Sequence, residues 1–321
     1  MTELRSGILP YSGPSRWNID QIVAELYTVR ARWRSRQQRN QEETNREFPS
    51  REVLRRLVQQ LTGALFPMRL GPADLKQTRE NYYIGHTLGT VLDELLAQVK
   101  LELRYAARHT DPTPEEEQRA VDIVADFAAQ LPDLRALLDT DVQAAFDNDP
   151  AARSVDEVLL CYPGITAIIH HRLAHALYRL GAPLVARIVA EIAHGDTGID
   201  IHPGAVIGGS FFIDHGTGVV IGETTVIGER VRLYQAVTLG ARRFPTDQNG
   251  VLQKGVPRHP VIEDDVVIYA GATLLGRITV GSRSVIGGNV WLTHSVDADT
   301  HITQNSLLNT PAADILAEHA G

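Results

Sequence analysis

The sequence has one cysteine, no excess of basic residues and no long apolar run, and each absence excludes a class of protein. The single cysteine, Cys161, cannot form an internal disulfide. The 39 acidic residues outnumber the 31 basic ones, and this net charge of −8 argues against a nucleic-acid-binding protein. No segment approaches the roughly eighteen apolar residues of a membrane-spanning helix. The start, MTELRSGILPYSGP, lacks the apolar core of a signal peptide, so we expect a cytoplasmic bacterial protein.

The rest of the composition is that of an ordinary globular protein. The 321 residues are enough for two domains, and 43% of them are hydrophobic. Cys161 follows the apolar segment Val158 to Leu160, so we interpret it as a small buried side chain rather than a reactive thiol.

An aliphatic residue stands at nearly every sixth position between residues 199 and 296. Neither the strand period of two nor the helical period of 3.6 produces this spacing, which is typical of a solenoid. A sandwich of short strands, the alternative, has wider and less regular spacing. Three hexads form one coil of a parallel β-helix, and short coils of this kind wind left-handed. The series consists of Ile201, Ile207, Ile213, Ile221, Ile227, Leu233 and Leu239, then Ile262, Ile268, Leu274, Val280, Ile286 and Leu292.

The N-terminal half has helical periodicity instead. Thr113, Pro114 and Glu116 form a capping box with proline at the first helical position, and Ser154 with Glu157 repeats the pattern. One predicted helix ends at Gly181, and the next runs from residue 183 to 194 and is closed by Gly195.

These patterns predict an α+β protein with an all-helical domain followed by a left-handed parallel β-helix. We place the helical domain at residues 1–195, the β-helix at 196–300 and a C-terminal tail at 301–321. No linker rich in proline, glycine or serine separates the first two parts. We therefore expect the last helices to pack on the first coils.

Two groups of polar residues in the helical half have both an ordinary and a functional interpretation. The arginines between Arg30 and Arg39 are interpreted as a solvated helix face rather than an anion or partner site. His171 and His175 share a helix face at a spacing that suits a metal ion. No third ligand follows at a suitable spacing, so we expect polar-face or capping roles.

Polar residues interrupt the repeat at three places, and these carry the functional signal. Asp200-Ile201-His202-Pro203 opens the first coil, Asp214-His215-Gly216 follows Ile213 where two extra residues break the rhythm, and Arg258-His259-Pro260 lies near the gap between the series. Because solenoid corners are usually occupied by uncharged residues, these side chains are site candidates. The coil length predicts that Asp200 lies near His215.

These motifs resemble those of the serine O-acetyltransferases, a family of hexapeptide-repeat acyltransferases. The resemblance extends from about residue 149 to 292. The motifs that carry it are Asp149-Pro150-Ala151, Asp200-Ile201-His202-Pro203, Asp214-His215-Gly216-Thr217-Gly218, Gly222-Glu223-Thr224, Val237-Thr238-Leu239-Gly240 and Arg258-His259-Pro260.

The resemblance implies transfer of an acetyl group from acetyl-CoA to L-serine, the first step of cysteine biosynthesis. His215 would be the general base for the serine hydroxyl, and Asp200 would orient its ring. Arg258 and His259 would bind the substrate carboxylate. Asp149 and Asp214 would bind its ammonium group. His202 is interpreted as structural.

The resemblance also implies a cofactor groove and an assembly. Acetyl-CoA would lie between neighbouring β-helices, and no metal is expected. The site would take His215 and His259 from different chains of a homotrimer or of a dimer of trimers, and L-cysteine would act as a feedback inhibitor. The groove residues would be Gly240, Ala241, Ala270, Gly271 and Gly288.

The chain departs from the family pattern at three points. Ala241 replaces a usual glycine, and the loop from residue 241 to 257 is longer and poorer in glycine. The sequence ends in Ala320-Gly321, where members that dock into cysteine synthase end in isoleucine, so a complex with cysteine synthase is not implied.

Other functions are compatible with a hexapeptide β-helix. One is acyl transfer to homoserine or an amino sugar, although the carboxylates with Arg258 favour a zwitterionic amino acid. Another is a zinc enzyme of the γ-carbonic anhydrase type with His202, His215 and His259 as ligands. The Asp-His pair favours proton transfer over this reading. A structural trimer without activity is the third alternative.

Overall fold

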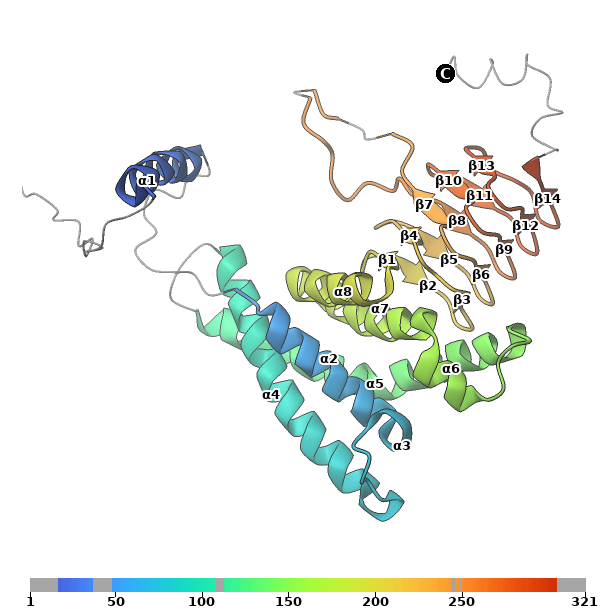
Figure 1. Ribbon diagram of the computed structural model, residues 1–321, viewed down its shortest axis with the longest axis horizontal. Coiled ribbons are helices and arrows are strands. Elements are labelled where there is room, and N and C mark those ends of the chain that lie inside the picture. The colour runs from blue at the N-terminus through green and yellow to red at the C-terminus, as the bar shows by residue number, and fades with distance from the viewer. Residues whose placement is uncertain (1–16, 37–47, 108–112, 244–245, 249, 305–321) are drawn as a thin grey trace, which may run out of the picture. The chain divides into compact units, whose positions relative to one another are not determined.

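The computed structural model describes residues 17–36, 48–107, 113–243, 246–248 and 250–304. The chain forms two compact units, Met1–Glu47 and Phe48–Gly321. The first contains the helix α1 (Ile19–Arg36), none of whose residues is buried (Figure 1). Its arginines are exposed, as expected for a solvated face, whereas Arg39 of the same run lies outside the described residues.

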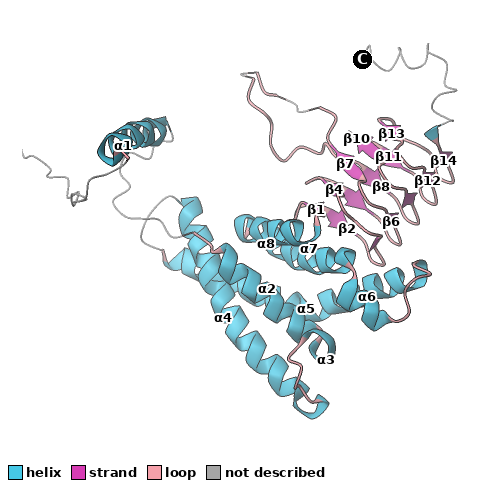
Figure 2. Cartoon of the chain, viewed as in Figure 1, coloured by secondary structure: helices cyan, strands magenta, loops and turns pink. Residues whose placement is uncertain are grey.

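The second unit begins with helices and continues into short parallel strands (Figures 1 and 2). Among the described residues, no helix is long and apolar enough to cross a membrane. The helical elements of this unit are α2 (Arg51–Leu65), α3 (Pro67–Leu70), the 3₁₀ helix η1 (Gln77–Arg79), α4 (Glu80–Ala107), α5 (Pro114–Asn148), α6 (Val155–Cys161), α7 (Pro163–Leu180) and α8 (Pro183–Thr197).

Local capping sets most of these helix ends. The predicted box at Thr113 is confirmed, because the Thr113 hydroxyl accepts from the Glu116 backbone N–H and the Glu116 carboxylate accepts from that of Thr113. Gly181 ends α7 in the left-handed region, with φ of 97°. The predicted end of α8 at Gly195 is wrong. The helix continues to Thr197, and Gly198 (φ 71°) is the first residue with the left-handed backbone of a helix stop.

Two predictions of side-chain orientation on helices are also wrong. Cys161 is exposed, because α6 buries Val158 and Leu159 and turns the two residues that follow toward solvent. Successive helical residues differ by about 100°, so an apolar run cannot all share one face. His171 is buried rather than on a polar face, and His175 donates to the Pro203 carbonyl oxygen over 2.8 Å, a contact between α7 and the first coil.

The strands confirm the repeat and form a parallel β-helix. Strands pair with the strand three places further along the chain, except that β12 pairs with β14, and this produces three parallel sheets. Sheet A contains β1, β4, β7, β10 and β13, sheet B contains β2, β5, β8 and β11, and sheet C contains β3, β6, β9, β12 and β14. All the aliphatic residues of the predicted series are buried. The strands are β1 (Asp200–Ile201), β2 (Val206–Ile207), β3 (Phe212–Ile213), β4 (Val220–Ile221), β5 (Val226–Ile227), β6 (Arg232–Leu233), β7 (Thr238–Gly240), β8 (Val261–Ile262), β9 (Val267–Ile268), β10 (Thr273–Leu275), β11 (Thr279–Val280), β12 (Val285–Ile286), β13 (Trp291–Leu292) and β14 (His301–Ile302).

Two edges of this triangular coil matter for the site. The CA corner is the turn from sheet C to sheet A, and the two inserted residues widen it between β3 and β4. The AB corner is the turn from sheet A to sheet B, which in the third coil carries the loop between β7 and β8. The last strand, β14, lies just past the boundary expected at residue 300 and pairs with β12.

A buried ion pair joins the helices to the first coil, as the missing linker predicted. Arg172 of α7 donates to both carboxylate oxygens of Asp141 of α5, over 3.1 and 3.0 Å. The same guanidinium donates to the backbone oxygens of Ile207 and Gly208. Because a charge left alone in the interior costs about 3–5 kcal/mol, this pair fixes α5 and α7 against the coil.

Candidate active site

Four of the polar side chains gather at the CA corner. His215 follows β3 in the left-handed region (φ 56°), and its Nε2 lies 3.9 Å from Oδ1 of Asp214. Asp149 caps the C-terminus of α5. Tyr162, at the N-terminus of α7, donates a hydrogen bond from its hydroxyl to the Asp149 carboxylate. We call these four residues the His215 group. They bring a histidine and two carboxylates to one place.

A glycine allows the helix to come this close to the coil. A Cβ on Gly164, in the first turn of α7, would lie 2.3 Å from the backbone oxygen of Ile213. No larger residue fits there without moving the backbone. This close contact holds Tyr162 beside the turn that carries Asp214.

Hydrogen bonding controls the charge of Asp149. The Tyr162 hydroxyl and the Ala151 backbone N–H both donate to its carboxylate and lower its pKa, and His215 adds to this effect. The same hydrogen bond raises the pKa of Tyr162 to about 12. Asp149 is therefore a stable anion, and Tyr162 a hydrogen-bond donor, throughout the neutral range.

A second group lies at the AB corner. We call Tyr178, Glu223, Thr224, Arg258 and His259 the His259 group. Arg258 forms an ion pair with Glu223 at 2.6 Å, and the Tyr178 hydroxyl donates to the other Glu223 oxygen over 3.3 Å. Thr224 accepts the backbone N–H groups of Arg258 and His259 at its hydroxyl oxygen.

His259 is held as a neutral ring of one tautomer. Its Nδ1 accepts from the Thr224 backbone N–H at 3.1 Å and lies 2.8 Å from the Thr224 hydroxyl oxygen. Burial, aided by the neighbouring Arg258, lowers the pKa of His259 to about 4. The proton of the neutral ring is therefore on Nε2, which is available to donate to a ligand. His202, beside Tyr178, also has its pKa lowered by burial.

Asp200 lies between the two groups, at the start of β1 in sheet A, paired in register with Val220. No hydrogen bond or ion pair joins it to His215 within the described parts of the chain. Instead its carboxylate lies near Glu191 and His194 of α8, with potential ligand atoms of the three all within 4.8 Å of one another. The His215 side chain, 71% exposed, contacts Asp214.

The five residues predicted to bind the cofactor divide between the same two corners. Ala270, Gly271 and Gly288 lie at the CA corner, in coils that follow the one carrying His215. Backbone hydrogen bonds connect these turns, from Gly271 N–H to the Gln235 oxygen (3.0 Å) and from Asn289 N–H to the Ala270 oxygen (2.9 Å). We call this line of small residues the CA column. Gly240 and Ala241 instead lie where sheet A ends at the AB corner.

Within one chain, sheet A thus separates the predicted residues into two sets. Asp149, Asp214 and His215 lie at one of its edges, and Arg258 and His259 at the other.

Comparisons with known proteins identify the family. A model described as bacterial transferase hexapeptide (six repeats) matches residues 259–294. The chain is 60% identical over 262 residues to the plasmid serine acetyltransferase of Synechococcus elongatus, an alignment covering 80% of this chain and 82% of that one. The chain belongs to the serine acetyltransferase family.

Solved structures of the family agree with this assignment. Serine acetyltransferase 1 of Entamoeba histolytica in complex with L-cysteine is 35% identical, with a TM-score of 0.67 over 88% of this chain and 99% of that one. The serine acetyltransferase of Neisseria gonorrhoeae in complex with serine is 26% identical, with a TM-score of 0.51 over 78% and 94%.

Four residues of the two groups have no role that the sequence patterns indicate, namely Tyr162, Tyr178, Glu223 and Thr224. Glu223 and Thr224 belong to one of the family motifs, and no pattern in the sequence distinguishes Tyr162 or Tyr178. Their partners lie far along the chain, since Arg258 is 35 residues from Glu223 and Tyr162 is 13 from Asp149. A glutamate and a threonine that follow Gly222 at a coil corner were the available signal.

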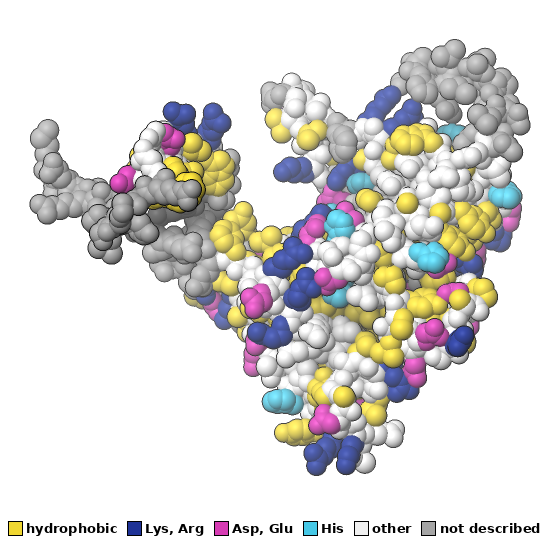
Figure 3. All heavy atoms as spheres, viewed as in Figure 1, with side chains coloured by type: hydrophobic (Ala, Val, Ile, Leu, Met, Phe, Trp, Pro, Cys, Tyr) yellow, Lys and Arg dark blue, Asp and Glu magenta, His cyan; other side chains and the backbone are white. Residues whose placement is uncertain are grey.

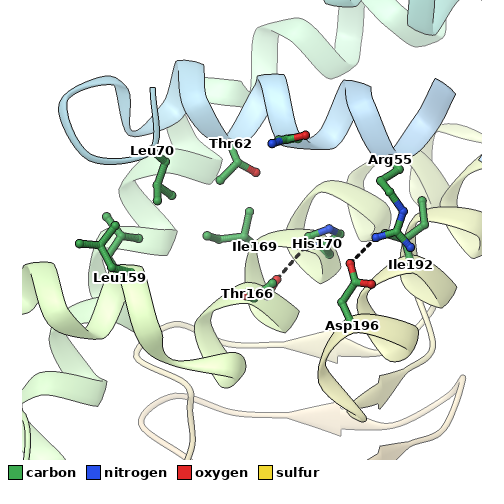
Figure 4. A pocket seen from close by; sticks show the side chains of 11 residues that line it. Arg55, Thr62, Leu70, Leu159, Thr166, Ile169, His170, Ile192 and Asp196 are labelled. Carbon is green, nitrogen blue, oxygen red and sulfur yellow. Dashed lines mark hydrogen bonds and ion pairs between the residues drawn. The ribbon is translucent and has the colours of Figure 1, made fainter. Parts of the chain in front are cut away.

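A cavity of about 450 Å³ lies elsewhere, among α2, α3, α6, α7 and α8 (Figure 4). Arg55 and Asp196 form an ion pair of 2.5 Å at its wall, and His170 Nδ1 donates to the Thr166 oxygen over 2.8 Å. None of the predicted site residues lines this cavity. It is separate from the two corners of the coil.

Proposed function

We propose that the protein transfers the acetyl group of acetyl-CoA to the hydroxyl of L-serine, which gives O-acetylserine and CoA in the first step of cysteine biosynthesis. The main support for this proposal is the His215 group, which places a histidine and two carboxylates at one coil corner in a chain of this family. The named activity of the relatives and the serine in the Neisseria structure support the same substrate.

His215 is the general base in this proposal. A serine hydroxyl is a weak nucleophile until a base within hydrogen-bond reach removes its proton. The exposed His215 ring is accessible to a substrate at the corner. After the serine oxygen attacks the acetyl carbonyl, the imidazolium returns the proton to the departing thiolate, so no proton is lost to water.

Asp200 orients His215 in this proposal. At 71% exposure the His215 side chain is free to change rotamer, and a turn toward sheet A would exchange its contact with Asp214 for one with Asp200. This exchange would leave Asp214 available for a substrate ammonium group. Asp200 therefore acts as a positioning residue.

The remaining polar residues recognise the amino acid. Asp149 and Asp214 supply negative charge for the ammonium group, and the depressed pKa of Asp149 keeps that charge in place. Arg258 and His259 face the carboxylate, His259 through its Nε2–H. The Glu223 ion pair keeps the guanidinium of Arg258 at a fixed position.

Acetyl-CoA fits along the CA column, because small side chains there leave backbone groups accessible. A Cβ on Gly288 would lie 3.2 Å from the Ala270 oxygen, so the turn tolerates little more than glycine. Together with Gly271, Gly240 and Ala241 these residues would line the groove. The CoA thioester would supply the acetyl group at the His215 end of the column.

The separation of the two corners supports an active site shared between chains. We infer a left-handed coil that assembles as a homotrimer, or as a dimer of trimers, in which the CA corner of one chain meets the AB corner of the next. His215 and His259 then act on one substrate from different chains. The residues that would dock into cysteine synthase, at the chain's end, lie outside the described part.

L-Cysteine should compete with L-serine. The two differ only in sulfur against oxygen, and the proposed recognition residues address the ammonium and carboxylate that both possess. A thiolate beside the His215 imidazolium is a favourable pair that serine does not form. Initial rates against serine at several cysteine concentrations, under reducing conditions, should show a rising apparent KM. An unchanged apparent KM for serine at millimolar cysteine would show that cysteine does not bind at the serine site.

The decisive experiment is release of free thiol from acetyl-CoA with a panel of acceptors. Serine should support turnover, and homoserine and amino sugars should support far less. Turnover of an amino sugar without serine would contradict the proposal. Metal analysis of the same protein separates the zinc alternative, for which one zinc per active site is expected.

A further inference from the structure

The apolar residues of α1 follow a seven-residue repeat. Ile19, Ile22, Leu26 and Val29 are spaced by three, four and three residues, the first and fourth positions of a heptad. They are 38%, 46%, 53% and 60% exposed. Figure 3 shows hydrophobic side chains grouped together on α1. Such a continuous apolar stripe on an exposed helix marks an interaction surface.

The charged residues beside this stripe complement one another between helices. With Ile19 at heptad position a, Glu25 is at position g and Arg30 at position e of the following heptad. Those positions face each other across a parallel coiled coil. Glu25 and Arg30 are five residues apart, too far around one helix to pair within it. No ion pair occupies either of them among the described residues.

We propose that α1 forms a parallel, in-register coiled coil with α1 of other copies of this chain. Isoleucine and leucine at a, with isoleucine and valine at d, belong to the pattern that favours three or more strands over two. Val23 at position e widens the apolar stripe, which also favours more than two strands. The helix therefore suits a three-stranded bundle.

The short length of α1 explains why this bundle needs the rest of the chain. Its 18 residues cover about two and a half heptads, and a helix of this length is marginal alone in water. When each copy is tethered to an assembled catalytic body, the effective concentration of the other copies is about millimolar. This high effective concentration offsets the low intrinsic stability of a short coiled coil.

A second copy fits α1 better than an anionic membrane does. A membrane-binding helix keeps its basic residues on one polar face. Here Arg30, Arg32 and Arg36 occupy heptad positions e, g and d, beside and within the apolar stripe. Membrane binding is therefore the competing outcome of the test.

Disulfide trapping in the full-length protein tests the proposal. In a Cys161→Ser background, Ile22→Cys places a thiol in the seam, and Ala24→Cys places one on the opposite face at position f. Mild oxidation should link at most about two thirds of the Ile22→Cys chains, the limit for pairs within a trimer, independently of protein concentration. Ala24→Cys should give at least fivefold less. Equal yields, or a yield that falls on dilution, would overturn the proposal.

Charge exchange tests the register and separates the membrane outcome. In the Ile22→Cys protein, Glu25→Arg should lower the disulfide yield several-fold, and Glu25→Arg with Arg30→Glu should restore it at unchanged net charge. Failure of the exchange to restore the yield would overturn the parallel register. Sedimentation with phosphatidylglycerol vesicles should carry down no protein. Vesicle binding lost in Ile22→Ser, without disulfide trapping in Ile22→Cys, would assign α1 to membranes.

Discussion

The CA and AB corners of sheet A each carry a histidine, held under opposite conditions. His215 at the CA corner is 71% exposed, and its Nε2 lies 3.9 Å from a carboxylate oxygen of Asp214. His259 at the AB corner is 7% exposed, accepts from Thr224 at Nδ1, and has its pKa lowered to about 4. One ring is exposed to solvent, and the other is fixed in place and in tautomer.

This difference fits the different roles that we propose for the two corners. A general base must take up and release a proton during each turnover, which a solvated ring does without the cost of burying a charge. A recognition group gains from the opposite condition, because a fixed donor binds the substrate without further ordering. The predictions below alter one corner at a time, from the largest expected effect to the smallest.

Removing the exposed histidine, His215, should have the largest effect on activity. His215→Ala should lower kcat by about 10²–10⁴, the usual contribution of general acid–base catalysis, with little change in the KM for serine. Steady-state thiol release measures both constants, and sedimentation checks that assembly is intact.

Asp200→Asn is the matched comparison, since it keeps the size of a residue proposed only to position His215. Its loss in kcat should be smaller than that of His215→Ala. A near-normal kcat in His215→Ala would remove this residue from the mechanism.

Displacing the fixed histidine should raise KM instead. A Cβ on Gly222 would lie 2.0 Å from Cδ2 of His259, so Gly222→Ala must push the ring from its place. Loss of a hydrogen bond to a charged carboxylate costs about 1.5–3 kcal/mol, or about 10- to 160-fold in the KM for serine. Gly89→Ala in α4, where no atom lies within 4 Å, is the control and should change neither constant. Equal KM values for the two variants would count against recognition by His259.

Much of the fold was readable because its signals are local or repeated. The buried position of every sixth residue follows from the period alone, and the capping box at Thr113 lies within four residues. The end of α8 was misplaced because Gly195 and Gly198 have the same side chain. Only the backbone angle of Gly198 identifies it as the stop.

The residue types of the candidate site could be predicted from the sequence, but most of their contacts could not. A histidine and two carboxylates gather at the corner that two inserted residues interrupt. Charge alone does not mark this corner, because the turns from sheet B to sheet C also carry charged residues such as Arg230, Asp265 and Arg283. The approach of Asp200 to His194, and the pairing of Arg258 with Glu223, depend on the packing of α8 and on the path of the 241–257 loop. Neither follows from spacing within the coil.

Mixing variants of the two corners should restore part of the activity. If a site takes His215 from one chain and His259 from the next, subunit exchange between His215→Ala and His259→Ala proteins leaves about a quarter of the sites with both histidines. Thiol release should rise toward a quarter of the wild-type rate after exchange. Exchange verified by mass spectrometry with no gain in rate would place both histidines of a site in one chain.

The smallest expected effect comes from Tyr162→Phe, which removes the hydrogen bond from the Tyr162 hydroxyl to the Asp149 carboxylate at the CA corner. The Tyr162 hydroxyl lowers the pKa of Asp149, so its removal should raise that pKa toward the ordinary value of an aspartate. Asp149 must be charged to bind an ammonium group, and this binding is lost as the pH falls through its pKa. The acid limb of kcat/KM for serine should therefore move to higher pH, and the loss of one hydrogen bond worth about 1 kcal/mol corresponds to about fivefold at the acid end. At pH 8 the variant should approach the wild type, because Asp149 is ionised there in both proteins. Tyr178→Phe at the AB corner is the control, since its hydroxyl contacts Glu223 and not Asp149. An acid limb that stayed in place in Tyr162→Phe would separate Asp149 from ammonium recognition.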